Sequence, residues 1–123
     1  MWTLSRTVMF DAAHHLPHHD GKCRRPHGHT YTLHVQVAGA TLHTSGPKQG
    51  MLVDFGDIDA AVRPLVGALL DHYDLNVTTQ LESPTSELLA QWVYVRLKGA
   101  LPGLVAVEIH ETPSSGCRYE ETT

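Results

Sequence analysis

The residues with the clearest chemistry lie in the short stretch Cys23–His29, which ends in His-Gly-His. Successive side chains of an extended strand point to opposite faces, so His27 and His29 would share one face at a spacing of about 7 Å. Two imidazoles at this spacing can bind one metal ion at about 2.0–2.1 Å each. The upstream sequence offers a third imidazole, His14. Three protein nitrogens and an open fourth position are typical of a catalytic zinc ion, beside which Cys23 would be a reactive thiol.

The residues alone leave alternatives to this assignment. His15 is adjacent to His14 and could replace it as a ligand. Cys23 could be a fourth ligand, which would close the site and make it structural. The histidines could also be unrelated polar residues at a strand edge. Five of the ten histidines fall within fourteen positions, and this cluster is neither contiguous nor terminal, so a metal site is favoured over a purification tag.

Length and composition restrict the class of protein. The chain has 123 residues, and we expect one domain over residues 1–123 with a hydrophobic core. Nine Lys and Arg against thirteen Asp and Glu give a net charge of −4, which argues against nucleic acid or an anionic membrane as the main partner. No apolar run approaches the ~20 residues of a membrane span. The first residues do not resemble a signal peptide, and two cysteines do not form a disulfide framework, so we expect a cytoplasmic protein with reduced thiols.

Alternating apolar and polar residues predict the strands that position the histidines. The expected strands span residues 2–10, 29–37, 51–55, 104–111 and 117–120. His27 and His29 would open the second strand on its apolar side. Residues 11–26 have no such period and contain two prolines, so they are expected to form a loop.

Two helices are expected between the third and fourth strands. Apolar residues recur at intervals of three and four from about residue 57 to 70, and Pro64 within this stretch predicts a bend or a late helix start. A second helix is expected with Ser83 as N-cap and Pro84 at the first helical position, ending before Pro102. The short strand at 51–55 runs into the first helix, and the order of two strands, two helices and two strands predicts an α+β fold, a four-stranded antiparallel sheet with two helices on one face.

Five motifs occur in the order seen in the 6-pyruvoyltetrahydropterin synthase superfamily, and the resemblance covers essentially the whole chain. They are Phe10-Asp11-Ala12-Ala13-His14, Cys23-x-x-x-His27-Gly28-His29, Leu70-Asp71-His72, Pro84-Thr85-Ser86-Glu87 and Glu111-Thr112. The three residues between the cysteine and His-Gly-His resemble the bacterial 6-carboxytetrahydropterin synthases of queuosine biosynthesis. The pyruvoyl-forming enzymes typically have a longer insert there.

The resemblance implies a fold, an assembly, a cofactor and a substrate. The fold would be the tunnelling fold (T-fold), in which monomers form trimers through a closed barrel and two trimers stack into a homohexamer. Active sites would lie at subunit interfaces. Zn²⁺ would bind to His14, His27 and His29. The substrate would be 7,8-dihydroneopterin triphosphate, and the products would be 6-carboxy-5,6,7,8-tetrahydropterin, acetaldehyde and triphosphate.

The resemblance also implies a proton-transfer group. Asp71 and His72 are similar to the family's Asp-His pair, in which the carboxylate orients the imidazole. Cys23 would be the catalytic thiol, and His72 would be its proton partner. A free thiol is mostly protonated at neutral pH, so nearby zinc and basic residues would have to activate it. Alternatively, Asp71 is only a carboxylate at a helix end, and His72 is a cation favoured by the helix dipole.

Substrate binding is expected at an acidic residue and at two arginines. Glu111 resembles the residue that anchors the pterin, because a carboxylate can accept hydrogen bonds from the pterin amino group and the adjacent ring N–H. The alternative is a solvated residue at a strand end. Arg24 and Arg25 are candidates for the triphosphate, or they are solvated loop residues. His110 precedes Glu111 where lysine is common in the family, which would alter the charge near the pterin.

The sequence analysis therefore favours a zinc-dependent carbon–oxygen lyase of the carboxytetrahydropterin-forming type. One rival is a pyruvoyl-forming synthase on the same scaffold, which would eliminate triphosphate without releasing acetaldehyde. A rival of another class is a zinc-stabilised pterin-binding module without turnover.

Overall fold

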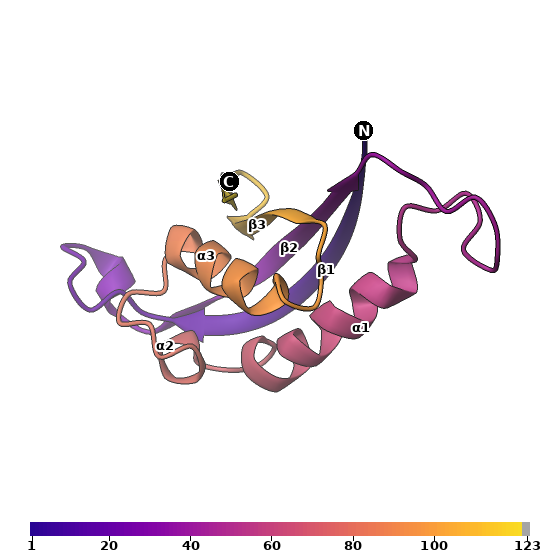
Figure 1. Cartoon of the computed structure of the whole chain (residues 1–123). Helices are drawn as coiled ribbons and strands as arrows, with labels where there is room; N and C mark the ends of the chain where they lie inside the picture. The colour runs from indigo at the N-terminus through magenta and orange to yellow at the C-terminus, as the bar shows by residue number, and fades with distance from the viewer. Residues whose placement is uncertain (122–123) are drawn as a thin grey trace.

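Four strands form one antiparallel sheet in the order β1-β2-β3-β4. The structure is a computed structural model that describes residues 1–121. The strands are β1 (Trp2–His14), β2 (His27–Gly39), β3 (Leu104–Thr112) and β4 (Ser115–Tyr119). The helices α1 (Phe55–Leu65), α2 (Leu75–Thr78) and α3 (Ser86–Leu97) lie on one side of the sheet (Figure 1). The expected α+β arrangement is confirmed, with the four-residue α2 as an additional element.

The long hairpin of β1 and β2 positions the histidines. The two strands pair from Trp2 opposite Gly39 to His14 opposite His27. Loops of residues 15–26 and 40–54 therefore lie at opposite ends of this hairpin (Figure 1). The expectation that residues 11–14 form a loop is wrong, because each of them pairs with a residue of β2 and continues the ladder.

The core lies between one face of the sheet and the helices. The large, deeply buried side chains of the sheet come from alternate positions of each strand, and each contributes about 1.5–3 kcal/mol when fully buried: Phe10, Tyr31, Leu33, Val35, Val107 and Ile109. The helices add Ile58, Val62, Leu89 and Val93. His14 lies on the same face and is 2% exposed, so a polar ring ends an otherwise apolar row.

The segment 51–55 is not a strand, which corrects the expectation from its apolar pattern. Its last residues begin α1 instead, because the Asp54 side chain accepts a hydrogen bond from the Gly56 N–H at 2.8 Å and caps the helix. The Met51 carbonyl accepts a hydrogen bond from the His43 N–H at 2.9 Å, within the same loop. The backbone groups of this segment are therefore used locally rather than in the sheet.

Helix α1 continues beyond Pro64 in a different form. Residues Val66–Leu70 make a π-helical turn, which closes with a bond of 2.8 Å from the Asp71 N–H to the Val66 carbonyl. Proline has no N–H to donate to the preceding turn, so a change of helical bonding near it is expected. The expected disturbance at Pro64 thus appears as a wider turn that leads directly into Asp71.

Helix α3 begins later than expected. Its N-cap is Thr85, whose hydroxyl accepts a hydrogen bond from the Leu88 N–H at 3.2 Å, and not Ser83. Pro84 lies outside the helix, and its carbonyl accepts a hydrogen bond from the ring of His14 at 2.8 Å. No helix within residues 1–121 is long and apolar enough to span a bilayer.

Candidate metal centre and active site

Three imidazoles converge at the end of the β1–β2 hairpin. One ring nitrogen of each of His14, His27 and His29 lies within 4.8 Å of the other two. His14 and His27 face each other across the ladder, and His29 follows on the same face of β2. The ring centroids are 4.5–5.1 Å apart, and the rings meet edge to face. This arrangement could hold a metal ion.

Backbone carbonyls fix the tautomers of two of these rings. The Nδ1–H of His14 donates to the Pro84 carbonyl at 2.8 Å, and the Nδ1–H of His27 donates to the Arg25 carbonyl at 2.8 Å. A carbonyl can only accept, so the proton of each neutral ring resides on Nδ1 and Nε2 keeps its lone pair. Metal-binding histidines commonly have this second hydrogen bond.

Two ring nitrogens of the cluster are buried without a hydrogen-bond partner in the described part of the chain, and such atoms could bind a cation. Nε2 of His14 and Nε2 of His29 are buried and have no hydrogen-bond partner within the described residues. A buried polar atom without a partner costs about 1–3 kcal/mol, which a metal bond would remove. Burial lowers the pKa of His14, against smaller opposing effects of the Pro84 carbonyl and Glu111. The neutral ring is the form that binds a metal.

Glu111 completes this end of the core with a negative charge. Its carboxylate oxygens lie 4.0 Å from Nε2 of His14 and 3.9 Å from Nε2 of His29. Because the pKa of His14 is lowered, the contact between Glu111 and His14 joins a carboxylate to a neutral ring at neutral pH. These distances exceed hydrogen-bond length, so Glu111 makes no hydrogen bond to either imidazole.

Cys23 lies beside the three imidazoles without joining them. It belongs to the short 3-10 turn Lys22–Arg24, and it lines a cavity of about 340 Å³ with Lys22, His27 and His29. Its thiol is free, and it is not part of the group whose ligand atoms all lie within 4.8 Å. Cys23 therefore lies outside the three-histidine group and shares a cavity with two of its members.

Asp71 and His72 form a pair at the open edge of β1. Nδ1 of His72 lies 3.0 Å from the Asp71 carboxylate, and the imidazole is 76% exposed. His72 has a backbone φ of 66°, in the left-handed region that non-glycine residues rarely adopt. His72 lines a cavity of about 570 Å³ together with Asp11, His29 and Thr30.

Asp11 holds this pair from the neighbouring strand. Its backbone N–H donates to the Asp71 carboxylate at 3.0 Å, and its carbonyl accepts from the His72 N–H at 2.6 Å. The bond from Asp11 is the main reason that the pKa of Asp71 is lowered, with a further contribution from His72. The Asp11 side chain accepts from the Thr30 hydroxyl at 2.5 Å, across the ladder.

The cavities of Cys23 and His72 are separate in one chain. The only residue that lines both is His29, and no hydrogen bond or ion pair joins Cys23 to Asp71 or His72 within residues 1–121. The structure therefore does not bring the expected thiol and imidazole together within one subunit.

A third cavity, of about 500 Å³, lies against Glu111 and the start of α3. Thr85, Ser86 and Cys117 also line it. Burial raises the pKa of the Cys117 thiol, and the charge of Glu87 adds to this effect, so the thiol stays protonated at neutral pH. The local sequence pattern gave no signal that Cys117 would line this cavity.

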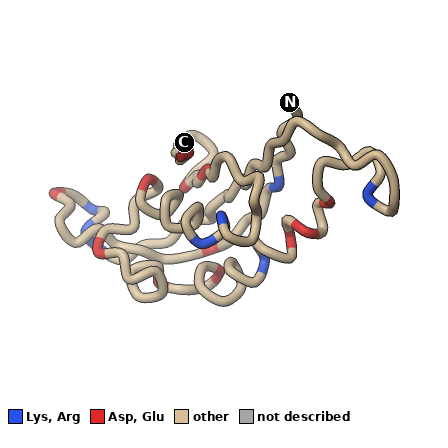
Figure 2. Tube along the Cα trace, viewed as in Figure 1, with Lys and Arg blue, Asp and Glu red and all other residues tan. Residues whose placement is uncertain are grey.

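The two candidate phosphate ligands and His110 lie apart from these contacts. Arg24 and Arg25 are exposed in the basic loop between β1 and β2 (Figure 2). Only the backbone carbonyl of Arg25 has a role in the cluster. His110 bonds to Glu108 at 3.2 Å, and it faces the opposite side of β3 from Glu111. It therefore does not line the Glu111 cavity.

Local sequence patterns indicated the three clustered histidines but missed the groups that orient them. The Pro84 carbonyl acts through a backbone atom 70 positions from His14, and no pattern of residue types reports such a contact. The same holds for the backbone of Asp11 and the turn at Asp71. Of the two adjacent histidines, the structure places His14 in the cluster and not His15.

Known proteins are similar to this chain over nearly its whole length. A family model described as 6-pyruvoyl tetrahydropterin synthase matches residues 3–122. A Synechocystis sp. protein named 6-carboxy-5,6,7,8-tetrahydropterin synthase is 49% identical over 97% of this chain and 93% of its own length. A Haemophilus influenzae protein of the same name is 33% identical over 98% of this chain and 100% of its own length. A solved structure, Caenorhabditis elegans 6-pyruvoyl tetrahydropterin synthase, superposes with a TM-score of 0.82 at 28% identity and covers 98% of this chain and 96% of that one.

Proposed function

This chain belongs to the 6-pyruvoyl tetrahydropterin synthase family, and we propose that it is a 6-carboxy-5,6,7,8-tetrahydropterin synthase. The reaction would convert 7,8-dihydroneopterin triphosphate to 6-carboxytetrahydropterin, acetaldehyde and triphosphate, within queuosine biosynthesis. The 49% identity to the Synechocystis protein of that name supports the choice within the family. The observation that carries the proposal is a cluster of three imidazoles with a free thiol beside it.

Zn²⁺ is the proposed cofactor, held by His14, His27 and His29. Three neutral imidazoles leave an open position, which is typical of catalytic rather than structural zinc. Bound there, zinc would supply a Lewis acid that polarises a side-chain oxygen of the substrate. The two carbonyl-fixed tautomers and the two orphaned Nε2 atoms support this ligand set.

The chain's own residues would supply proton transfer. The Cys23 thiol lies in the cavity with His27 and His29, so it can exchange a proton with a substrate carbon held near the metal centre. Asp71, which the Asp11 N–H keeps ionised, would hold Nδ1–H of His72 and leave Nε2 to carry a proton.

We propose that these groups meet between subunits. Cys23 and His72 line separate cavities of one chain, so a site that needs both would be completed by a second copy. The predicted assembly is a trimer or a dimer of trimers, with Cys23 of one subunit facing the Asp71–His72 pair of its neighbour. β1 and β4 are the edge strands of the sheet, and strand edges are where copies can pair.

Glu111 is the proposed pterin anchor. Its carboxylate lies about 4 Å from two of the proposed metal ligands, so a pterin bound to it would reach the metal centre with its side chain. The cavity of about 500 Å³ against the start of α3 has room for a bicyclic ring. Arg24 and Arg25 remain candidates for the triphosphate at the loop beside Cys23.

Product analysis tests the reaction and separates the nearest rival. The purified, zinc-loaded protein is incubated with 7,8-dihydroneopterin triphosphate, and acetaldehyde and triphosphate are measured. We expect equal amounts of both. Release of triphosphate without acetaldehyde would indicate the pyruvoyl-forming reaction, and turnover of neither would favour a binding module.

Two substitutions test the assigned roles. Cys23→Ala should retain zinc and the fold while turnover is lost, whereas a structural ligand would lose metal and stability together. His27→Ala should lose most of the zinc, and full retention would rule out the ligand set.

Mixed oligomers test the shared site. Cys23→Ala and His72→Ala should each be inactive alone, but co-expression should restore about a quarter of the wild-type activity, because each site then draws both functional groups from different subunits at random. No recovery in mixed oligomers would show that both groups act from one chain.

A further inference from the structure

The side chain of Asn76 makes hydrogen bonds to two loop segments, one that follows His14 and one that precedes α3. Its Oδ1 accepts from the His15 N–H at 2.9 Å, and its Nδ2 donates to the His15 carbonyl at 2.9 Å. The same Nδ2 donates to the Glu82 carbonyl at 3.1 Å. The Asn76 amide thus bonds both backbone groups of His15, as a neighbouring strand would. It also bonds the backbone of Glu82, in the segment that precedes α3.

Both segments determine where the His14 ring points. His15 follows His14 directly, so its backbone fixes the end of the strand that carries the ring. Glu82 lies two residues before Pro84, whose carbonyl accepts the Nδ1–H of His14 at 2.8 Å. Asn76 therefore connects the backbone that carries the ring to the segment that carries its acceptor.

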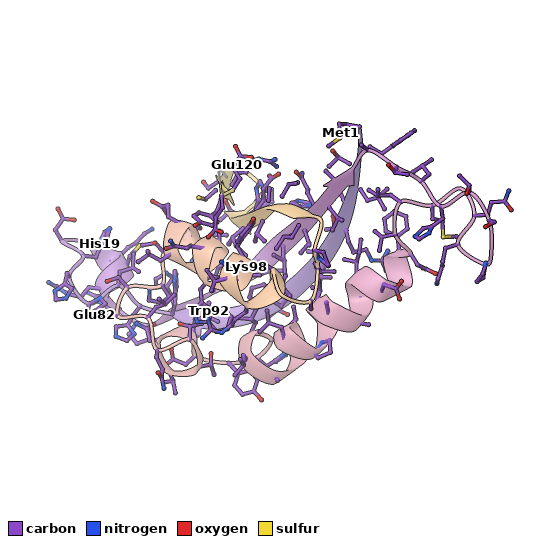
Figure 3. All side chains as sticks on the ribbon, in the orientation of Figure 1. Met1, His19, Glu82, Trp92, Lys98 and Glu120 are labelled. Carbon is purple, nitrogen blue, oxygen red and sulfur yellow. The ribbon has the colours of Figure 1, made fainter. Side chains whose placement is uncertain are left out.

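Other contacts between these segments are weak by comparison. His18 and Glu82 form a pair at 2.6 Å, but both side chains are 76% exposed, and exposed pairs contribute little. Figure 3 shows His19 and Glu82 at the same end of the molecule, where many polar side chains extend outward. Asn76 itself projects from α2, which is fixed by the N-cap Asp74 and by the fully buried Leu75.

We propose that Asn76 is a positioning residue for the metal centre, acting through the backbone of His15 and through Pro84 to aim Nε2 of His14. This role rests on the proposed metal site. Residues that orient a metal ligand from outside commonly change metal affinity by 10–100-fold when they are replaced.

Asn76→Ala and Asn76→Asp test the proposal. The first removes all three side-chain bonds, and the second keeps the shape and the acceptor for the His15 N–H but loses both donors. We expect both variants to bind Zn²⁺ at least about tenfold more weakly than wild type, measured by competition with a chromophoric chelator. Substituted Co²⁺ should show an altered d–d absorption spectrum, which a loop change far from the ligands would not produce.

Thr78→Ala is the matched control. Its hydroxyl bonds to the Asp74 carbonyl at 3.3 Å within the same short helix and touches neither His15 nor Glu82. This variant should bind Zn²⁺ and Co²⁺ like wild type. An equal loss of affinity in Thr78→Ala and Asn76→Ala would mean that α2 acts as a whole, which overturns the specific role of Asn76.

A measurement on the wild-type protein covers the case in which the Asn76 variants do not fold. The His15 amide should be protected from hydrogen exchange without metal, although it lies in a loop, and rapid exchange overturns the proposal. Failure of the metal site is distinguishable: if His27→Ala loses zinc while Asn76→Ala retains wild-type affinity, only the role of Asn76 fails. Equal affinity in wild type and His27→Ala would remove the metal site itself.

Discussion

Replacing His72 with glycine should separate stability from activity. His72 has φ of 66°, and this left-handed conformation costs an ordinary residue about 1–2 kcal/mol. Its side chain contributes little in return, because the ring is 76% exposed and forms a surface pair with Asp71, which is worth less than about 1 kcal/mol. Glycine adopts this conformation without strain.

The magnitude follows from the comparison with alanine. His72→Ala loses the ring and retains the strain, so it should be slightly less stable than wild type. His72→Gly relieves about 1–2 kcal/mol of strain but gains about 0.4–1 kcal/mol of unfolded-chain entropy. The midpoints of these two ranges make the glycine variant more stable than the alanine variant by about 0.8 kcal/mol. Both should lose turnover, because both lack the imidazole.

Denaturant unfolding at one protomer concentration and saturating zinc measures this difference, since assembly and ligand both shift apparent stability. Gln80 is the internal control, because its φ is 60° and its side chain is exposed. Gln80→Gly should likewise exceed Gln80→Ala in stability, but both should retain full turnover. If His72→Ala proves as stable as His72→Gly, the strain argument is wrong, and if His72→Gly keeps its turnover, the proton-transfer role is wrong.

Three further predictions concern stability. Tyr31→Phe should raise the free energy of unfolding by about 1 kcal/mol, because the buried Tyr31 hydroxyl has no hydrogen-bond partner in the described chain; a loss of stability in denaturant would contradict this. The Asp11 N–H lowers the pKa of Asp71, so this carboxylate stabilises the fold above its unfolded pKa of about 4, and the stabilisation is lost as pH falls through the lower folded value. Asp71→Asn should thus be less stable than wild type at pH 7 and closer to it at low pH, as followed by unfolding midpoints. Gly116→Ala should cost about 1–3 kcal/mol in thermal unfolding, because the new Cβ would lie 2.2 Å from Nδ1 of His110.

Alternation of residue types was sufficient to predict the sheet but not its ends. The ladder continues through residues 11–14 because each has a partner in β2, and pairing of this kind depends on a segment more than a dozen residues away. The prediction of a strand at 51–55 was wrong for the opposite reason, because Asp54 acts locally as the N-cap of α1. A distant strand partner decided the first case, and a local helix cap decided the second.

The same distinction applies to the site. The parity of His27 and His29 is a property of one strand, so two of the three clustered rings could be placed on one face from sequence. The separation of Cys23 from His72 depends on how a loop and a π-helical turn lie around the hairpin, and no local period contains it. Interpreting those two residues as partners required the family resemblance.

The pairing of His14 with His27 has a consequence for how the chain reaches its native state. These rings come together only when thirteen residues of β1 align with β2 in the observed frame. A slip by one position would turn His27 and His29 toward the other side of the sheet relative to His14. An ion that requires all three nitrogens would therefore bind to correctly aligned chains alone, and mass action would select them from misaligned ones. A metal ion would then increase the fraction of chains with the correct strand register, in addition to its proposed role in catalysis.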